Sequence, residues 1–335
     1  MPAQEGCAMP KKRLNVMLMG AGGNMRGAHV PRIAADGAVE IVGVADPVER
    51  QAQALMARAG HEIPYFSNWR SMLRETQADG VLISTPHKDH YPQAKACLEG
   101  GMHVLIEKPL VIQPTQAKRL LALSADSGLA LVVAYQRHWM PHFVYARELV
   151  HNGTLGEIRG VVAYVTQNWL GIGGWRLDPE LSGGGMFMDT GSHLVASTLW
   201  VTGLQPKFVS GSFDNVGRAV DINGGVVVRF ANDAIGTLTS TGNASRHDER
   251  LVISGSKGSL VLHQHQWRVR SMLLNDEPVQ PPKRIRPSSP DRAFFAWIRN
   301  GLARYEAPDF ALQVSRLTEA AYRSAEVGKP VRVRP

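Results

Sequence analysis

The sequence predicts an α/β protein with two domains. The amino-terminal one is a parallel sheet covered by helices, and the carboxy-terminal one is an α+β domain with a large, mostly antiparallel open sheet. Short apolar runs alternate with helical segments as far as residue 134, whereas strands follow one another from residue 158 onward. The 335 residues also suffice for two domains of about 150 residues each. We expect a tail over residues 1–13 and domains over residues 14–134 and 135–335.

The amino-terminal elements are expected to alternate between strand and helix. The apolar runs that predict strands cover residues 14–19, 39–45, 80–85, 104–106 and 129–134. The segments that predict helices cover residues 28–35, 49–59, 91–98 and 115–127. The last helix is followed by Gly128, a residue type that often terminates helices. Continuous apolar strands between helices are typical of a parallel sheet with both faces covered.

The carboxy-terminal elements follow a different order. After a helix over residues 141–151, strands are predicted over residues 158–166, 208–213, 225–230, 234–241, 251–254 and 259–263. Strands at such short spacing pair antiparallel. Two more helices are expected to begin at Ser289-Pro290 and Asp309 and to end at Gly301 and Gly328. The exposed face of this sheet is a natural oligomer interface, so we expect a homo-oligomer.

Composition narrows the class of protein. With 44% hydrophobic and 20% charged residues the chain is an ordinary globular sequence, and its two cysteines, Cys7 and Cys97, cannot form a disulfide framework. Apolar runs are shorter than the roughly 20 residues of a membrane-spanning helix, so we expect a soluble cytoplasmic protein with no membrane partner. The net charge of +8 favours anionic ligands, but the basic residues fall in short pieces, so no nucleic-acid partner is expected.

A glycine-rich turn follows the first predicted strand. In Gly20-Ala21-Gly22-Gly23-Asn24-Met25, the first two glycines allow a tight turn and the close approach of a pyrophosphate. Asp46 ends the second strand about 20 residues later, where a carboxylate reaches a ribose 2′-hydroxyl. Because a carboxylate repels a 2′-phosphate, NAD is favoured over NADP, although Arg50 nearby argues the other way. The alternative role for Asp46 is that of a helix N-cap.

Two further segments carry groups suited to chemistry. Glu107-Lys108-Pro109 directly follows a strand, and because ligands bind at the carboxyl ends of parallel strands, Lys108 would point at a cofactor cleft. Asp189 and His193 are four residues apart, on one face of a predicted helix that runs to Gly203. A histidine can take a hydroxyl proton while a carboxylate fixes its orientation. The alternatives are a surface lysine, a capping aspartate and a packed histidine.

These segments, in this order, resemble the Gfo/Idh/MocA oxidoreductases over roughly residues 14 to 330. Further matches are Thr85-Pro86-His87 with His90, and Trp175-Arg176-Leu177-Asp178-Pro179. The resemblance implies a Rossmann domain that binds a dinucleotide and a sugar, cyclitol or related hydroxyl compound held against the carboxy-terminal sheet. It makes Lys108, Asp189 and His193 the catalytic trio. Either Lys108 or His193 could accept the proton.

The resemblance and the motifs together give candidate binding residues. For the cofactor these are Gly20, Gly22, Gly23, Asn24, Met25, Asp46, Arg50, Thr85, Pro86, His87, His90, Glu107 and Lys108. For the substrate they are Gln136, Arg137, His138, Trp169, Trp175, Arg176, Asp189 and His193; tryptophan faces stack on sugars, and Arg176 could bind a carboxylate. No metal site is expected.

The sequence departs from the family pattern at two positions, and three functions are compatible with it. Met25 replaces the third glycine, and Ala196 stands where many members carry a substrate-binding aspartate. The leading interpretation is an NAD(P)-dependent dehydrogenase acting on a hydroxyl carbon of a sugar, polyol, cyclitol or sugar acid. One alternative is a lyase, epimerase or glycosidase in which tightly bound NAD takes and returns the hydride. The other is a non-catalytic dinucleotide-binding sensor or regulator, which retention of the whole trio disfavours.

Overall fold

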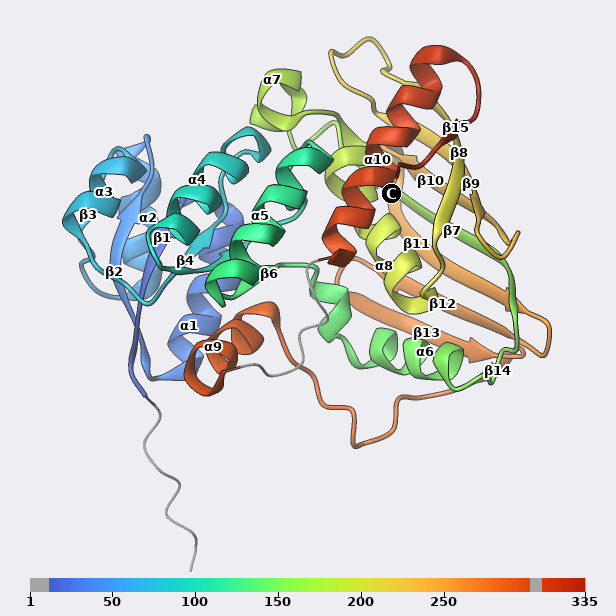
Figure 1. Ribbon diagram of the computed structural model, residues 1–335, viewed down its shortest axis with the longest axis horizontal. Coiled ribbons are helices and arrows are strands. Elements are labelled where there is room, and N and C mark those ends of the chain that lie inside the picture. The colour runs from blue at the N-terminus through green and yellow to red at the C-terminus, as the bar shows by residue number, and fades with distance from the viewer. Residues whose placement is uncertain (1–11, 302–308, 335) are drawn as a thin grey trace, which may run out of the picture.

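The computed structural model describes residues 12–301 and 309–334, so most of the predicted tail lies outside the described residues. Figure 1 shows the amino-terminal sheet and its helices on one side and the larger sheet on the other. Together they confirm the predicted α/β fold with two sheets of different kinds. None of the described helices is both long and apolar enough to cross a bilayer.

Within the described residues, the amino-terminal sheet has six parallel strands in the order β3-β2-β1-β4-β5-β6. They are β1 (Leu14–Met19), β2 (Val39–Ala45), β3 (Tyr65–Phe66), β4 (Gly80–Ile83), β5 (His103–Ile106) and β6 (Leu131–Val133). This is the Rossmann order, in which the chain changes direction between β1 and β4 and leaves a crevice for a ligand. The two-residue β3 has no apolar run and was not expected.

The helices of this half are η1 (Met25–His29), α1 (Val30–Asp36), α2 (Glu49–Ala59), α3 (Trp69–Glu75), α4 (His87–Glu99) and α5 (Pro114–Ser127). Four helical segments of this half correspond to predicted ones, with two starting earlier than expected, whereas the seven-residue helix α3 was not predicted. The helix after the glycine turn begins at Met25 with a π-turn rather than at residue 28. Helix α4 begins directly after Pro86, four residues earlier than predicted, and tolerates Pro92 in its second turn. Both earlier starts bring helix amino termini closer to the crevice.

The chain then crosses into the second half through short helical pieces. These are η2 (Gln136–Trp139), α6 (Pro141–His151), η3 (Gly174–Leu177), α7 (Pro179–Ser182), η4 (Phe187–Gly191) and α8 (Ser192–Thr202). Between α6 and η3 runs β7 (Ile158–Asn168), the central strand of the second sheet. The predicted apolar helix up to Gly203 is therefore formed by η4 and α8 together, and its first turn is a wide π-turn.

The second sheet has nine strands in the described part of the chain, in the order β14-β13-β12-β11-β7-β10-β9-β8-β15. Besides β7 these are β8 (Pro206–Asp214), β9 (Asn223–Phe230), β10 (Ile235–Thr241), β11 (Asn243–Gly255), β12 (Ser259–His265), β13 (Arg268–Leu274), β14 (Glu277–Pro278) and β15 (Val331–Arg332). All pairs are antiparallel except β7 with β10. The longer β11 begins eight residues before the predicted strand, and two of these residues, His247 and Glu249, line the crevice.

One face of this sheet packs on helices and the other is open. Helix α8 contacts β7, and α10 (Asp309–Val327) contacts β8. Helix α6 packs on α8. On the opposite face, Val162 pairs with Thr237, which pairs with Val227, so these side chains form one row across three strands. Val162 and Val227 are 48% and 45% exposed. An apolar row on an open sheet face is the kind of surface that a partner subunit covers.

After β14 the chain returns to the amino-terminal sheet, where α9 (Pro290–Asn300) contacts α1, β5 and β6. Phe294 and Phe295 are fully buried in the core of that sheet. Gly80 leaves the space for this packing, because a Cβ there would lie 2.8 Å from Phe294. Ser289 caps the helix by accepting a hydrogen bond from the Arg292 amide. Thus α9 belongs to the amino-terminal core although it follows the second sheet in sequence.

Candidate active site

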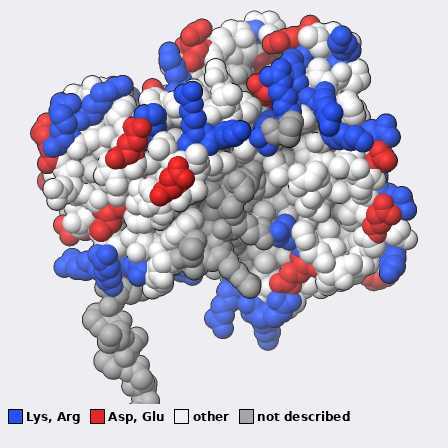
Figure 2. All heavy atoms as spheres, viewed as in Figure 1, with Lys and Arg blue, Asp and Glu red and all other residues white. Residues whose placement is uncertain are grey.

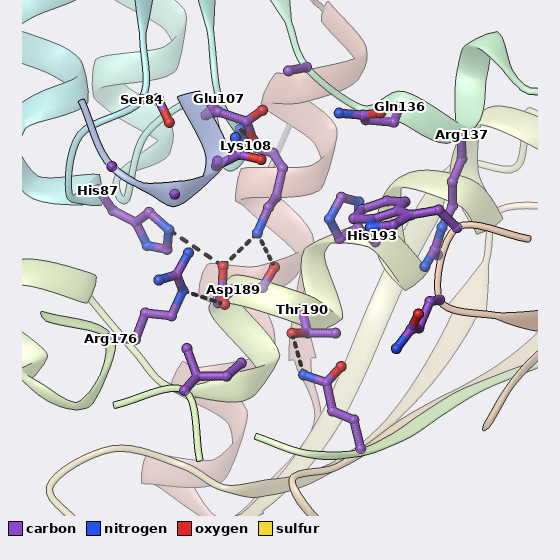
Figure 3. A pocket seen from close by; sticks show the side chains of 18 of the residues that line it. Ser84, His87, Glu107, Lys108, Gln136, Arg137, Arg176, Asp189, Thr190 and His193 are labelled. Carbon is purple, nitrogen blue, oxygen red and sulfur yellow. Dashed lines mark hydrogen bonds and ion pairs between the residues drawn. The ribbon is translucent and has the colours of Figure 1, made fainter. Parts of the chain in front are cut away.

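A crevice of about 480 Å³ lies where the carboxyl ends of β1, β4 and β5 face the second sheet. Figure 3 shows Ser84, His87, Glu107 and Lys108 reaching in from the first half and Arg176, Asp189, Thr190 and His193 from the second. A cavity of this size, with few charged groups converging, is typical of a small-molecule site. On the face drawn in Figure 2, lysine and arginine side chains gather toward the edges with acidic side chains among them.

The glycine turn forms one wall of the crevice. Gly20 has a φ of +86°, and a Cβ there would lie 2.4 Å from the carbonyl oxygen of Ser84, so only glycine fits. Gly22 and Gly23 line the crevice and face open space, since no atom lies within 4 Å of the point that a Cβ would occupy at either residue. Backbone left bare in this way can approach a phosphate closely. Met25 is fully buried in the core beneath the turn.

Asp46 fixes the shape of the glycine turn. Its Oδ2 accepts a hydrogen bond of 2.7 Å from the Ala21 amide, and its Oδ1 accepts one from Val48. The N-cap of α2 is Val48, so Asp46 does not cap that helix. Neither Asp46 nor the exposed Arg50 lies on the wall of the crevice itself. Their contact with a ribose stays a prediction.

His87 and His90 have different surroundings. His87 lines the crevice, with Nδ1 2.8 Å from the carbonyl of Ser182. Burial lowers the pKa of His87 to about 3, although Asp189 opposes this, so the ring is neutral. His90 is fully buried, and its two nitrogens lie 2.8 and 3.1 Å from the carbonyls of Pro109 and Thr85. His90 therefore connects the two loops that carry Thr85 and Lys108. Pro86 directly precedes α4 and does not line the crevice.

Glu107 is held from behind by a residue that the sequence did not indicate. Nε2 of the buried His29 lies 3.1 Å from Oε1 of Glu107, and its Nδ1 lies 2.6 Å from Oδ1 of Asp291 in α9. Burial opposes protonation, but Asp291 and Glu107 raise the pKa of His29 to about 10. A charged imidazolium thus joins the crevice wall to α9. These residues are far apart in sequence, which is why no local pattern marks the cluster.

Asp189 is the meeting point of the site. Lys108 Nζ donates to its Oδ1 at 2.5 Å and to its main-chain oxygen at 3.1 Å. Arg176 Nε and Trp169 Nε1 donate to Oδ2 at 3.0 and 3.2 Å. Burial favours the neutral acid, but Lys108, Arg176 and His87 hold the pKa of the Asp189 carboxyl well below its usual range. Asp189 is therefore a permanent anion that fixes Lys108.

The glycines before Asp189 allow this turn to form. A Cβ on Gly185 would lie 1.9 Å from the carbonyl oxygen of Asp221, and the Asp221 carboxylate accepts hydrogen bonds from the Gly185 and Phe187 amides. The spacing of four residues predicts that Asp189 orients His193, but no hydrogen bond joins these two described side chains. The π-turn widens the helix here, and the carboxylate is already engaged by cations.

His193 lines the crevice and is 7% exposed. Its ring meets Tyr135 and Trp267 edge to face, with centroid distances of 6.4 and 5.6 Å. Burial, together with Lys108 and Arg137, lowers the pKa of His193 well below 6.5. The ring is therefore a neutral imidazole near neutral pH, the form that can accept a proton.

The predicted substrate residues divide into two groups. Gln136, Arg137, Trp175 and Arg176 line the crevice. His138 does not: it is buried and stacks on Trp200 at 4.5 Å. Trp169 is fully buried and holds Asp189 from behind, so it too lies outside the crevice wall.

The structure also adds residues that the sequence did not indicate. They are Ser84, Ala134, Gln167, Ile172, Thr190, His247, Glu249, Gln266 and Trp267. His247 and Glu249 alternate as residues of one strand face do, but the predicted strand began at residue 251. Trp267 lies in the turn between β12 and β13. Among the described residues, no group of three or more His, Cys, Asp or Glu side chains is placed to hold a metal ion.

Comparison with known proteins assigns the chain to a family. Residues 14–135 match the family described as "Oxidoreductase family, NAD-binding Rossmann fold", and residues 143–261 match the "GFO/IDH/MocA C-terminal domain". The chain belongs to the Gfo/Idh/MocA oxidoreductase family. The predicted resemblance is thereby confirmed, as is an NAD-type Rossmann domain.

The chain is similar to several named proteins. The chain is 31% identical over 198 residues to D-glucoside 3-dehydrogenase of Escherichia coli, covering 58% of this chain and 56% of that protein's length. It is 25% identical over 272 residues to myo-inositol 2-dehydrogenase of Thermotoga maritima, covering 79% and 78%. The crystal structure of GenD2 from gentamicin A biosynthesis in complex with NAD is 26% identical, with a TM-score of 0.81 and 97% of each chain covered.

Proposed function

We propose that this member of the Gfo/Idh/MocA family is an NAD-dependent dehydrogenase that oxidises a hydroxyl carbon of a sugar or polyol to a carbonyl. One observation carries the proposal. A neutral imidazole, His193, and a fixed ammonium, Lys108, face the same crevice beside a glycine turn suited to a dinucleotide. These are the groups that removal of a hydride and a proton from one alcohol requires.

The roles of the residues follow from their surroundings. His193 accepts the hydroxyl proton, because its ring is neutral and reaches the crevice. Lys108 donates a hydrogen bond to the same oxygen and stabilises the negative charge that develops as the O–H bond breaks. Asp189 keeps the ammonium in one position. NAD, when bound, supplies the acceptor for the hydride, so the alcohol loses one C–H and one O–H bond and becomes a carbonyl.

The crevice and the glycine turn that Asp46 supports fit a dinucleotide. Gly22 and Gly23 present bare backbone at the amino end of η1, where the helix favours a phosphate, and Asn24 lines the crevice beside them. Asp46 has lone pairs beyond those that Ala21 and Val48 use, and a ribose hydroxyl can donate to them. Its negative charge favours NAD over NADP.

The relatives support the same class of reaction, since their names describe dehydrogenases of a glucoside and of myo-inositol. The test is incubation of the protein with NAD, and separately NADP, and a panel of sugars, polyols and sugar acids. Reduced nicotinamide and substrate are followed in the same samples. Formation of NADH with loss of a sugar supports the proposal. Loss of sugar without NADH would instead indicate an enzyme that returns the hydride, and no change in either would indicate a sensor.

We also infer that the chain forms a homodimer or homotetramer through its open sheet. The row that contains Val162 and Val227 exposes apolar side chains that a second copy would cover. Multi-angle light scattering tests this inference: a dimer or tetramer is expected, and a Val227→Lys substitution should produce monomers. A monomeric wild-type protein would contradict it.

A further inference from the structure

One end of the crevice carries polar side chains that the proposed reaction does not use. His247 and Glu249 come from β11, and Trp267 comes from the turn that follows β12. Arg137 reaches the same place from η2. These side chains line the part of the crevice that adjoins His193, where a bound substrate would contact them.

Arg137 and Glu249 form a bidentate ion pair. Arg137 Nη2 donates to Oε2 of Glu249 at 2.6 Å, and its Nη1 lies 2.5 Å from Oε1. Both residues are 4% exposed. This bidentate pair occupies the two Nη atoms of Arg137, which would otherwise be available to bind a substrate carboxylate. A carboxylate of a substrate at this end would meet the negative charge of Glu249 instead of a free cation.

The catalytic end of the crevice is also balanced in charge. Lys108 and Arg176 both donate to Asp189. Together with Arg137 they are all the lysine and arginine side chains that line the crevice in the described part of the chain. Each of them already has a carboxylate partner, so the crevice offers no unpaired cation to an acidic substrate.

One ring nitrogen of His247, Nε2, is a buried polar atom. This atom has no hydrogen-bond partner among the described residues. It lies 4.0 Å from Oε2 of Glu249, too far for a direct hydrogen bond. Buried polar atoms are nearly always paired, so this nitrogen requires a partner. A hydroxyl between the two can donate to the carboxylate and interact with the imidazole.

Trp267 adds an apolar surface beside these polar groups. The side chain is 58% exposed, and its ring lies edge to face with His193. A flat indole next to the proton acceptor suits the C–H face of a sugar ring.

We propose that His247 and Glu249 recognise hydroxyl groups of the substrate, and that this substrate is an uncharged sugar or cyclic polyol rather than a sugar acid. The proposal rests on the proposed function for the reason why a sugar enters the crevice. It adds that the substrate is uncharged and that His247 and Glu249 select it.

Equilibrium binding tests the proposal without turnover. Calorimetry on the complex of the protein with NADH would compare D-glucose with D-glucuronate and D-galactose with D-galacturonate. In at least one pair the neutral sugar should bind about tenfold more tightly, because the acid carries a charge without a partner. A result in which no neutral sugar binds more tightly than its acid overturns the proposal.

Two variants identify the residues responsible. Glu249→Gln frees the Arg137 guanidinium, so the preference for the neutral sugar should fall about tenfold or reverse. His247→Ala should weaken binding of the neutral sugar about tenfold and leave NADH binding unchanged; it keeps the test usable if the first variant does not fold. Glu277→Gln, an exposed carboxylate on the edge strand β14, is the matched control and should change neither affinity.

The outcomes separate this proposal from the proposed function. If Glu249→Gln leaves the ratio of affinities at the wild-type value and His247→Ala leaves the affinity for the neutral sugar unchanged, the subsite is wrong even when NADH is produced. If the wild-type protein binds neutral sugars as predicted and the variants respond, the subsite stands, even when the turnover assay yields no reduced cofactor.

Discussion

The ammonium of Lys108 lies 2.5 Å from Oδ1 of Asp189, on a carboxylate whose other oxygen is held by Arg176 and Trp169. Asp189 therefore acts as an anchor with its position set from three sides. Lys108 follows β5 and Asp189 lies in the turn before α8, so this contact joins the two halves of the molecule at the crevice.

Replacement of Lys108 by methionine should lower kcat by about 10² to 10⁴, because the charge that develops on the substrate oxygen loses its stabilising cation. Lys95→Met is the matched control, since that side chain is 40% exposed and pairs with Glu99 on the surface of α4. Steady-state kinetics and calorimetric NAD binding check the prediction. Equal kcat values for the two variants would show that Lys108 has no part in the reaction.

The pH profile should report the state of His193. Its pKa is lowered well below 6.5 by burial and by the neighbouring cations Lys108 and Arg137. The neutral ring is the active form, so activity is lost only as the pH falls through this lowered pKa. The value of kcat/KM should thus stay level from about pH 8 down to about pH 6.5. An acid limb centred at or above pH 6.5 in the wild type would argue against His193 as the proton acceptor.

Substitution of Gly185 by alanine should disturb the turn that presents Asp189. The added Cβ would lie 1.9 Å from the carbonyl oxygen of Asp221, and relief of that overlap costs about 1–3 kcal/mol of stability. We expect a lower melting temperature and a lower kcat. Gly225→Ala is the control, because no atom lies within 4 Å of its Cβ position. Thermal unfolding of both variants decides the matter, and equal melting temperatures would contradict the account.

His29 should stabilise the protein most at low and neutral pH. The pKa of His29 is raised from 6.5 to about 10 by Asp291 and Glu107, against the effect of burial. A raised pKa gives a contribution that is complete below pH 6.5 and is lost as the pH rises toward 10. His29→Gln should therefore cost about 3 kcal/mol near pH 6, where it leaves buried carboxylates without their cation.

The difference between wild type and His29→Gln in free energy of unfolding should shrink steadily between pH 6.5 and pH 10. Denaturant unfolding at a series of pH values measures it. A difference that does not change with pH would mean that His29 is neutral in the folded protein.

The order of elements in the amino-terminal half was predictable because its signals are local. The helix over residues 49–59 was predicted at its true bounds, as were the strands over residues 14–19 and 39–45. Each is a mostly apolar run or an amphipathic segment, and tertiary contacts do not alter it. The short strand β3 was missed because only two residues pair with β2.

The site was predictable only where a motif carries it. Lys108, Asp189 and His193 were found because they lie in conspicuous segments near turns. Glu249 and Trp267 were not, because they reach the crevice through the pairing of β11 with β7 and through the turn after β12, which no local pattern specifies. The same applies to Asp291, which meets His29 only because α9 returns to the first sheet.

The most direct test of the central claim is the amount of reduced nicotinamide formed for each sugar molecule consumed by the wild-type protein with NAD. If the chain is a dehydrogenase that releases its reduced cofactor, NADH should appear in step with the loss of sugar, one for one. Consumption of sugar with no NADH in solution, or no consumption of any sugar, would contradict the claim.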